Sequence, residues 1–418
     1  MRNPSSAPPA VIADLHAHYP MHVRPQRPTL GELSASPGRR RMVIEHLDGL
    51  ALGGASRLWN YESPRSGPRA TVAGMREGGV GVALSVLHLP LLEMGERLTV
   101  PYQRRPPYGV PPANHYFPAL LRQLELIERR VAVRHCQTAI IARSPAELDA
   151  GMAAGKLVLV HCVEGGFQLG STAEAVDDAV TLLARLGIAY ITLAHLFWRH
   201  VATNEPSVPF LGSRRYRRLF PQPEVGLTDL GRAAVRAMVG QRVLLDLSHM
   251  SKRALDDAFA LLDELDPERA VPVIASHVAV RFGRQTYNLD PPTIARIAAR
   301  GGLIGLIVAE YQATDGLRRA RTLSFEDSFA VLASHIDRIR EITGSHRHTA
   351  IGSDFDGFSK PLAGLADMRS LGHLGAALCD RYGDSGELIA AGNVLRLLRS
   401  AWGKPMKDTQ PTRRLTCS

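Results

Sequence analysis

The sequence predicts an α/β fold, a (β/α)8 TIM barrel of the metal-dependent hydrolase type. Eight short, β-branched apolar runs recur along the 418 residues, and continuous apolar strands are typical of parallel sheets buried on both faces. Segments with helix-start signals lie between these runs. Strands that alternate with helices eight times favour a closed barrel over an open sheet. The composition, 45% hydrophobic and 22% charged, is that of an ordinary globular protein.

Each predicted strand is an apolar run followed directly by polar residues. The runs are residues 10–15, 80–87, 157–163, 188–194, 243–247, 271–275, 303–308 and 348–353.

The predicted helices begin at capping residues. Ser144 precedes Pro and has Glu three residues later, and Ser171 starts the same capping box before the segment AVDDAVTLLARLG. Thr228, Ser251, Asp290 and Ser324 each precede a further segment of helical periodicity.

We expect one domain over residues 1–418, interrupted by irregular segments. Residues 24–70 and 97–118 are rich in Pro and Arg and show no periodicity, which is typical of long loops. The residues after Trp402 form a short basic tail. A formal charge of +10 would suit nucleic acid, but no extended basic stripe with interleaved aromatic residues accompanies the arginine clusters, so we expect no nucleic-acid partner. No signal peptide or membrane segment is found, and we expect a cytoplasmic protein.

Polar side chains that can bind metals follow six of the eight predicted strands. Catalytic groups of such barrels come from the carboxyl ends of the strands, so we expect these side chains to meet at one end. They are His16, His18, Glu164, His195, His249, His277 and Asp354.

These residue types suit a pair of divalent cations, because imidazole and carboxylate are ligands of Zn²⁺. We expect Glu164, which two glycines follow, to bridge the ions and Asp354 to accept and return a proton. Asp246 either orients a site histidine or is a structural acid. His161 is as consistent with the core as with the site, and His88 is interpreted as a loop residue.

The motifs resemble those of the renal or membrane dipeptidase family, peptidase family M19 of the amidohydrolase superfamily. The matching pieces occur in family order: DLHAH from Asp14, VEGG from Val163, ITLAH from Ile191, DLSHMS from Asp246, PVIASH from Pro272 and IGSDFDG from Ile351.

The resemblance implies two zinc ions per chain, one held by His16, His18 and Glu164 and the other by Glu164, His249 and His277. It also implies that His195 polarises the scissile carbonyl and that Asp354 is the proton shuttle. A homodimer is the family-level expectation. The family's glycolipid anchor has no counterpart here, so no membrane anchor is expected.

The sequence departs from the family pattern at two candidate site positions, and its segment between His249 and His277 is longer than is usual in the family. The first pair is His-x-His, where well-known members have His-x-Asp, which removes one negative charge. At the family's carboxylate-binding Arg, the nearest alignment gives Tyr287, with Arg281 and Arg284 as possible substitutes. A tyrosine cannot form the charged bidentate fork of an arginine.

The sequence thus predicts a zinc-dependent dipeptidase that acts through a metal-bridging hydroxide on dipeptides or another small molecule. The alternatives are a metal hydrolase of a cyclic amide, a lactone or a deaminase substrate, a metal-dependent nuclease, and a non-catalytic metal-binding barrel.

Overall fold

The computed structural model describes residues 11–23, 67–89, 93, 116–208, 211–318 and 321–403. Eight parallel strands pair in a closed ring, because β1 pairs with both β2 and β9 and β2 pairs with β4. The predicted (β/α)8 barrel is therefore confirmed. The barrel strands are β1 (Ile12–Ala17), β2 (Val80–Leu87), β4 (Leu157–Glu164), β5 (Tyr190–Thr192), β6 (Leu244–Asp246), β7 (Val273–Val278), β8 (Leu303–Leu306) and β9 (Thr349–Ile351).

A ninth strand that the sequence analysis missed lies outside this ring. β3 (Ala139–Ala142) pairs in parallel with the first half of β4. The last two residues of β4, Val163 and Glu164, pair with β5. Its four residues, AIIA, are too short a run to separate from a loop by periodicity. The predicted strands at 10–15 and 271–275 also run further along the chain, so His16 and His277 lie within β1 and β7.

The predicted capping residues begin the helices around the barrel. The side chains of Ser144, Thr228, Ser251, Asp290 and Ser324 each accept a hydrogen bond from the backbone N–H three residues later. At the segment after β4, however, the cap is Thr172 rather than Ser171. These helices are α6 (Pro145–Ala153), α7 (Ala173–Arg185), α9 (Asp229–Gln241), α10 (Lys252–Leu265), α11 (Pro291–Ala299) and α13 (Phe325–Thr343).

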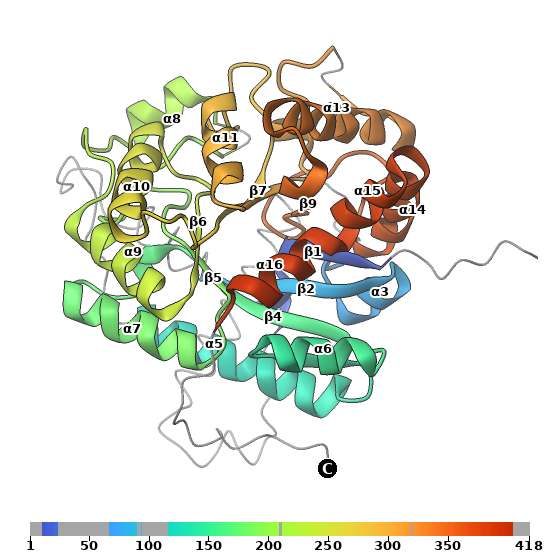
Figure 1. Cartoon of the computed structure of the whole chain (residues 1–418), viewed down its shortest axis with the longest axis horizontal. Helices are drawn as coiled ribbons and strands as arrows, with labels where there is room; N and C mark the ends of the chain where they lie inside the picture. Colours follow the sequence, from blue (N-terminus) through green and yellow to red (C-terminus); the bar gives the residue numbers. More distant parts are fainter. Residues whose placement is uncertain are drawn as a thin grey trace, which may run out of the picture.

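Several helices were not foreseen. Those with eight or more residues are α5 (Tyr116–Arg130), α14 (Leu371–Tyr382) and α16 (Asn393–Ala401). Shorter ones are α3 (Val72–Glu77), α8 (Ser213–Leu219), α12 (Glu310–Ala313) and α15 (Asp384–Glu387). α16 crosses the amino-terminal mouth of the barrel (Figure 1), and its Val394, Leu397 and Leu398 join the apolar cluster inside the ring. The opposite, carboxyl-terminal mouth is therefore where a site can open.

Most of the two predicted loop insertions lies outside the described residues. Within them, residues 67–70 have no regular structure and Tyr116 begins α5, while the tail from residue 404 is again outside the described part. The single-domain organisation stays a prediction. Among the described ranges, no helix has the length and hydropathy needed to cross a bilayer.

Close backbone contact inside the barrel generates a stability prediction. A Cβ on Gly305 in β8 would lie 1.9 Å from the carbonyl oxygen of Ser276, whereas a Cβ on Gly240 in α9 would meet nothing within 4 Å. We expect Gly305→Ala to lower the free energy of unfolding by about 1–3 kcal/mol, the usual cost of overpacking. Gly240→Ala should leave that energy unchanged or raise it by up to about 1 kcal/mol. Urea unfolding of the two variants checks this, and equal stabilities would contradict it.

Candidate metal centre

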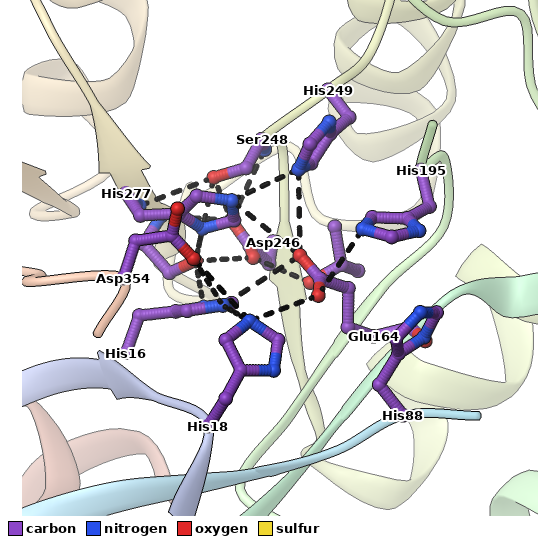
Figure 2. A network of polar contacts seen from close by, with 12 residues as sticks. His16, His18, His88, Glu164, His195, Asp246, Ser248, His249, His277 and Asp354 are labelled. Carbon is purple, nitrogen blue, oxygen red and sulfur yellow. Dashed lines mark hydrogen bonds and ion pairs between the residues drawn. The ribbon is translucent and has the colours of Figure 1, made fainter. Parts of the chain in front are cut away.

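All seven predicted strand-end residues meet at the carboxyl-terminal mouth of the barrel (Figure 2). His16, His277 and Glu164 lie within their strands, and the others follow strand ends by one to three residues. Each of the seven is at least 93% buried. The parallel strands bring these side chains together because their carboxyl ends all face the same way.

The carboxylate of Glu164 lies at the centre of this group. Its Oε1 is 3.4 Å from the Nε2 atoms of both His249 and His277 and 3.6 Å from that of His16. Its Oε2 lies 3.5 Å from Nε2 of His18 and 3.4 Å from that of His195. Among the described residues, neither oxygen has a hydrogen-bond partner. Burial raises the pKa of this carboxyl group well above its usual value.

The imidazoles on either side of Glu164 approach in two pairs. The Nε2 atoms of His16 and His18 are 3.2 Å apart, and those of His249 and His277 are 2.9 Å apart. Burial lowers the pKa values of His16, His249 and His277, that of His249 to about 4, which keeps these rings neutral. Neutral imidazole is the form that binds metal. Buried neutral nitrogens converging on an orphaned carboxylate fit a cation centre with the donor set that Zn²⁺ prefers.

Two residues of the centre have left-handed backbone conformations. His249 has φ 65° and Asp354 has φ 57°, which is uncommon for residues other than glycine. Oδ1 of Asp354 lies 3.3 Å from Nε2 of His18, and Oδ2 accepts a hydrogen bond from the Ser359 hydroxyl at 3.0 Å. A Cβ at position 357 would lie 1.9 Å from Oδ1 of Asp354, so a side chain at this position would displace the Asp354 carboxylate. Backbone strain of this kind is concentrated at functional sites.

Below the imidazoles, one serine joins two of them to a buried acid. The Ser276 hydroxyl oxygen lies 2.9 Å from Nδ1 of His16, 2.8 Å from Nδ1 of His277 and 2.6 Å from Oδ2 of Asp246. Asp246, which the sequence left open as an orienting or structural acid, reaches the two histidine rings through Ser276. It also accepts a hydrogen bond from the Ser248 hydroxyl, which in turn accepts one from the His277 backbone N–H. Sequence reasoning missed Ser276, although it directly precedes His277.

A second carboxylate lies behind His195. Oε2 of Glu93 is 2.6 Å from Nδ1 of His195 and 3.5 Å from Nε2 of His88, and Nδ1 of His88 is 3.1 Å from the Glu164 carbonyl oxygen. Neither Glu93 nor His88 belongs to a sequence motif or a periodic segment, so the sequence gives no signal for Glu93 and places His88 in a loop. His161, in contrast, is buried on the face of β4 opposite Glu164, since side chains alternate along a strand.

A pocket of about 320 Å³ opens above the centre. Tyr287 lines it, but its hydroxyl donates to the His277 carbonyl oxygen at 2.6 Å. Arg281 does not line the pocket: its guanidinium donates to the carbonyl oxygens of Thr286 and Asn288 in its own loop. Arg284 is exposed and also lies off the pocket. Within the described part of the chain, no Lys or Arg lines this pocket.

Comparison with known proteins identifies related sequences. A family model described as membrane dipeptidase (peptidase family M19) matches residues 43–408, a span that begins after His16 and His18. Dipeptidase tcpJ of Claviceps purpurea is 28% identical over 251 residues, which are 59% of this chain and 51% of the relative. An uncharacterized dipeptidase of Schizosaccharomyces pombe is 29% identical over 255 residues, 60% of this chain and 53% of the relative. The chain thus spans about half the length of these curated relatives.

Solved structures share the fold. A family M19 metallopeptidase named dipeptidase AC superposes with a TM-score of 0.68 at 21% identity, over 95% of this chain and 100% of that one. A metallopeptidase from Rhodobacter sphaeroides, solved with a phosphinate mimic of the dipeptide L-Ala-D-Ala, gives a TM-score of 0.66 at 22% identity, over 94% and 100% of the two chains.

The orphaned Glu164 carboxylate generates a prediction about metal and stability. A ligand that binds only the folded state stabilises it, by about 2.7 kcal/mol at a hundred times its Kd. We expect chelator-treated protein to unfold at a lower temperature than the zinc-loaded protein, as measured by differential scanning fluorimetry. Glu164→Gln should lose most of this difference, whereas His373→Ala, a change at an exposed histidine outside the centre, should keep it. An equal response of all three proteins would contradict a zinc centre at Glu164.

Proposed function

The chain belongs to the membrane dipeptidase family, peptidase family M19, and from this premise we propose that it is a zinc-dependent dipeptidase. The observation that carries the proposal is the buried Glu164 carboxylate between two pairs of imidazoles, without a hydrogen-bond donor of its own among the described residues. Burying a charge is costly unless it is paired or binds a metal.

In this proposal His16, His18 and Glu164 hold one zinc ion, and Glu164, His249 and His277 hold the other. Bound there, the two ions would supply the Lewis acidity that polarises a peptide carbonyl and makes water nucleophilic at neutral pH. Ser276 and Asp246, beneath the imidazole rings, orient the side chains that would hold the ions. Ser276 fixes the rotation of His16 and His277 from their Nδ1 atoms, so their Nε2 atoms face Glu164.

His195 is positioned to act on the carbonyl oxygen of the substrate. Burial raises the pKa of Glu93 and lowers that of His195, which favours a neutral pair sharing one proton. With that proton on Glu93, the carboxyl O–H donates to Nδ1 and the ring keeps its hydrogen on Nε2. Nε2 lies 3.4 Å from Glu164 and faces the centre, so its N–H can stabilise the negative charge that develops on the carbonyl oxygen.

Asp354 is the group we assign to proton transfer. Its Oδ1 is beside His18 at the pocket floor, and the Ser359 hydroxyl holds its Oδ2. A carboxylate held this way can accept a proton at Oδ1 during attack and return it to the departing amine nitrogen.

A second candidate is hydrolysis of an amide without a free carboxylate, such as a cyclic amide. The observation that favours it is the lack of Lys or Arg among the described residues of the pocket lining, where a dipeptide's carboxylate would need a partner. Assays with dipeptides and with cyclic amides distinguish the two candidate functions.

We expect about two zinc ions per chain and chelator-sensitive cleavage of L,L or L,D dipeptides, as a paired-metal hydrolase requires. Elemental analysis and a coupled amino-acid assay measure both. His277→Ala, within β7, is a better ligand deletion than a change at His249, whose φ of 65° an alanine would adopt with strain. It should lower zinc content and reduce activity by more than roughly 100-fold, beyond the usual cost of losing an outer-shell partner. Bound zinc with turnover of cyclic amides alone would favour the second candidate.

The proton shared by Glu93 and His195 generates a prediction that two variants of Glu93 test. Glu93→Leu removes the donor to Nδ1 of His195, and we expect kcat to fall roughly 10- to 100-fold with zinc content unchanged. Glu93→Gln can still donate to Nδ1 through its amide, so it should keep most of the activity. Equal losses in the two variants would mean instead that the ionised carboxylate of Glu93 is what His195 requires.

A further inference from the structure

The outer wall of the pocket is apolar and comes from one stretch of chain. This stretch connects β5 to α9 and includes α8, near the upper edge of Figure 1. The six apolar side chains that it contributes to the pocket lining are Leu196, Phe197, Val208, Leu211, Leu219 and Phe220. The first two follow His195 directly, so the wall is continuous with the catalytic floor.

Aromatic contacts and one buried hydroxyl hold the wall together. The rings of Phe197 and Phe220 have centroids 4.7 Å apart, and Tyr216 lies 5.3 Å from Phe220. The Tyr216 hydroxyl is buried; it donates to the Leu196 carbonyl oxygen at 2.5 Å and accepts from the Asn204 amide at 2.8 Å. α8 is thereby fastened to the segment after β5, and the wall is formed before any substrate binds, as is usual for small-molecule sites.

The six side chains keep part of their surface open to the pocket. Leu219 is 38% exposed and the other five are half-buried, although each is a large apolar residue. Clustered exposed apolar surface marks a binding site, because covering it with another apolar group removes it from water. A substrate group of either charge placed there would lose its hydration, and none of the six wall side chains carries a charge that could compensate it.

We propose that this wall, defined by Leu196, Phe197, Val208, Leu211, Leu219 and Phe220, is a specificity subsite for a large apolar side chain of the substrate. The inference rests on the proposed dipeptidase function and narrows its substrate class. Dipeptides that carry Phe or Leu fill the subsite, whereas dipeptides with Glu or Lys in the same position are discriminated against.

The test compares kcat/KM of the zinc-loaded protein for Ala-Ala with values for Phe-Ala, Ala-Phe, Glu-Ala, Ala-Glu, Lys-Ala and Ala-Lys. We expect one order of the Phe pair to exceed Ala-Ala by roughly 10- to 200-fold, the range that added apolar contact in a pocket supplies. The charged dipeptides should not exceed Ala-Ala. Both orders are needed because they tell which residue of the dipeptide contacts the wall.

Two variants and a control assign any preference to the wall. Phe220→Ala should lower kcat/KM for the favoured Phe dipeptide at least roughly 10-fold more than for Ala-Ala. Phe282→Ala, at an exposed aromatic outside the pocket, should leave the preference unchanged. Leu219→Lys alters an exposed position and should fold even if Phe220→Ala does not. It should raise the ratio of Glu-dipeptide to Phe-dipeptide cleavage.

The outcomes separate this inference from the proposed function. Cleavage of Ala-Ala without any preference for Phe, or a preference that both wall variants retain, overturns the subsite and leaves the dipeptidase standing. Failure to cleave any dipeptide with zinc bound overturns the dipeptidase and the subsite together. The subsite is supported if Phe220→Ala loses kcat/KM for the Phe dipeptide selectively, or if Leu219→Lys cleaves the Glu dipeptide in preference to the Phe dipeptide.

Discussion

The structure depends on the buried carboxylate of Glu164, which lies among five imidazoles. Glu164 lies at the barrel mouth with five histidine Nε2 atoms within 3.6 Å and no hydrogen-bond donor to its oxygens among the described residues. A carboxylate in such surroundings is expensive unless a cation compensates it. The imidazole nitrogens of the two histidine pairs that surround Glu164 are ligands that a metal ion could bind, which is the basis of the zinc site that we propose. The need to compensate the buried Glu164 carboxylate thus explains why the surrounding histidines are buried and why their rings point toward it.

The barrel beneath the centre is built to keep these groups in place. Ser276 touches both His16 and His277 with its hydroxyl, while its backbone carbonyl packs against Gly305 and Gly352, where any Cβ would lie within 2 Å. Asp246 holds the same serine. The rotation of the His16 and His277 rings is therefore tied to the close packing of neighbouring strands, and a side chain at Gly305 or Gly352 would disturb the ring positions along with the fold.

The pocket has two parts with different origins. Its polar floor comes from residues in or directly after the strands, whereas its apolar wall comes from the connection between β5 and α9. Loops above a rigid barrel are where such folds vary their substrates. The polar floor carries out the reaction that we propose. The apolar wall, which the hydrogen bonds of Tyr216 hold in place, selects among substrates of that reaction.

The sequence by itself determined the barrel, five of the six predicted helix caps and the meeting of seven strand-end residues at one mouth of the barrel, because strand alternation and parallel direction decide where strand-end residues go. His16, His249 and Asp354 are far apart in the chain, yet each was found from its local run. Only the tertiary structure decided the roles of Glu93, Ser276 and the wall residues. Glu93 acts through a contact with His195, 102 residues away, and no local period marks such a partner. Phe220 is an ordinary apolar residue until folding places it beside Phe197 at the pocket. Long-range side-chain packing carries that information, and it exists only once the chain has folded.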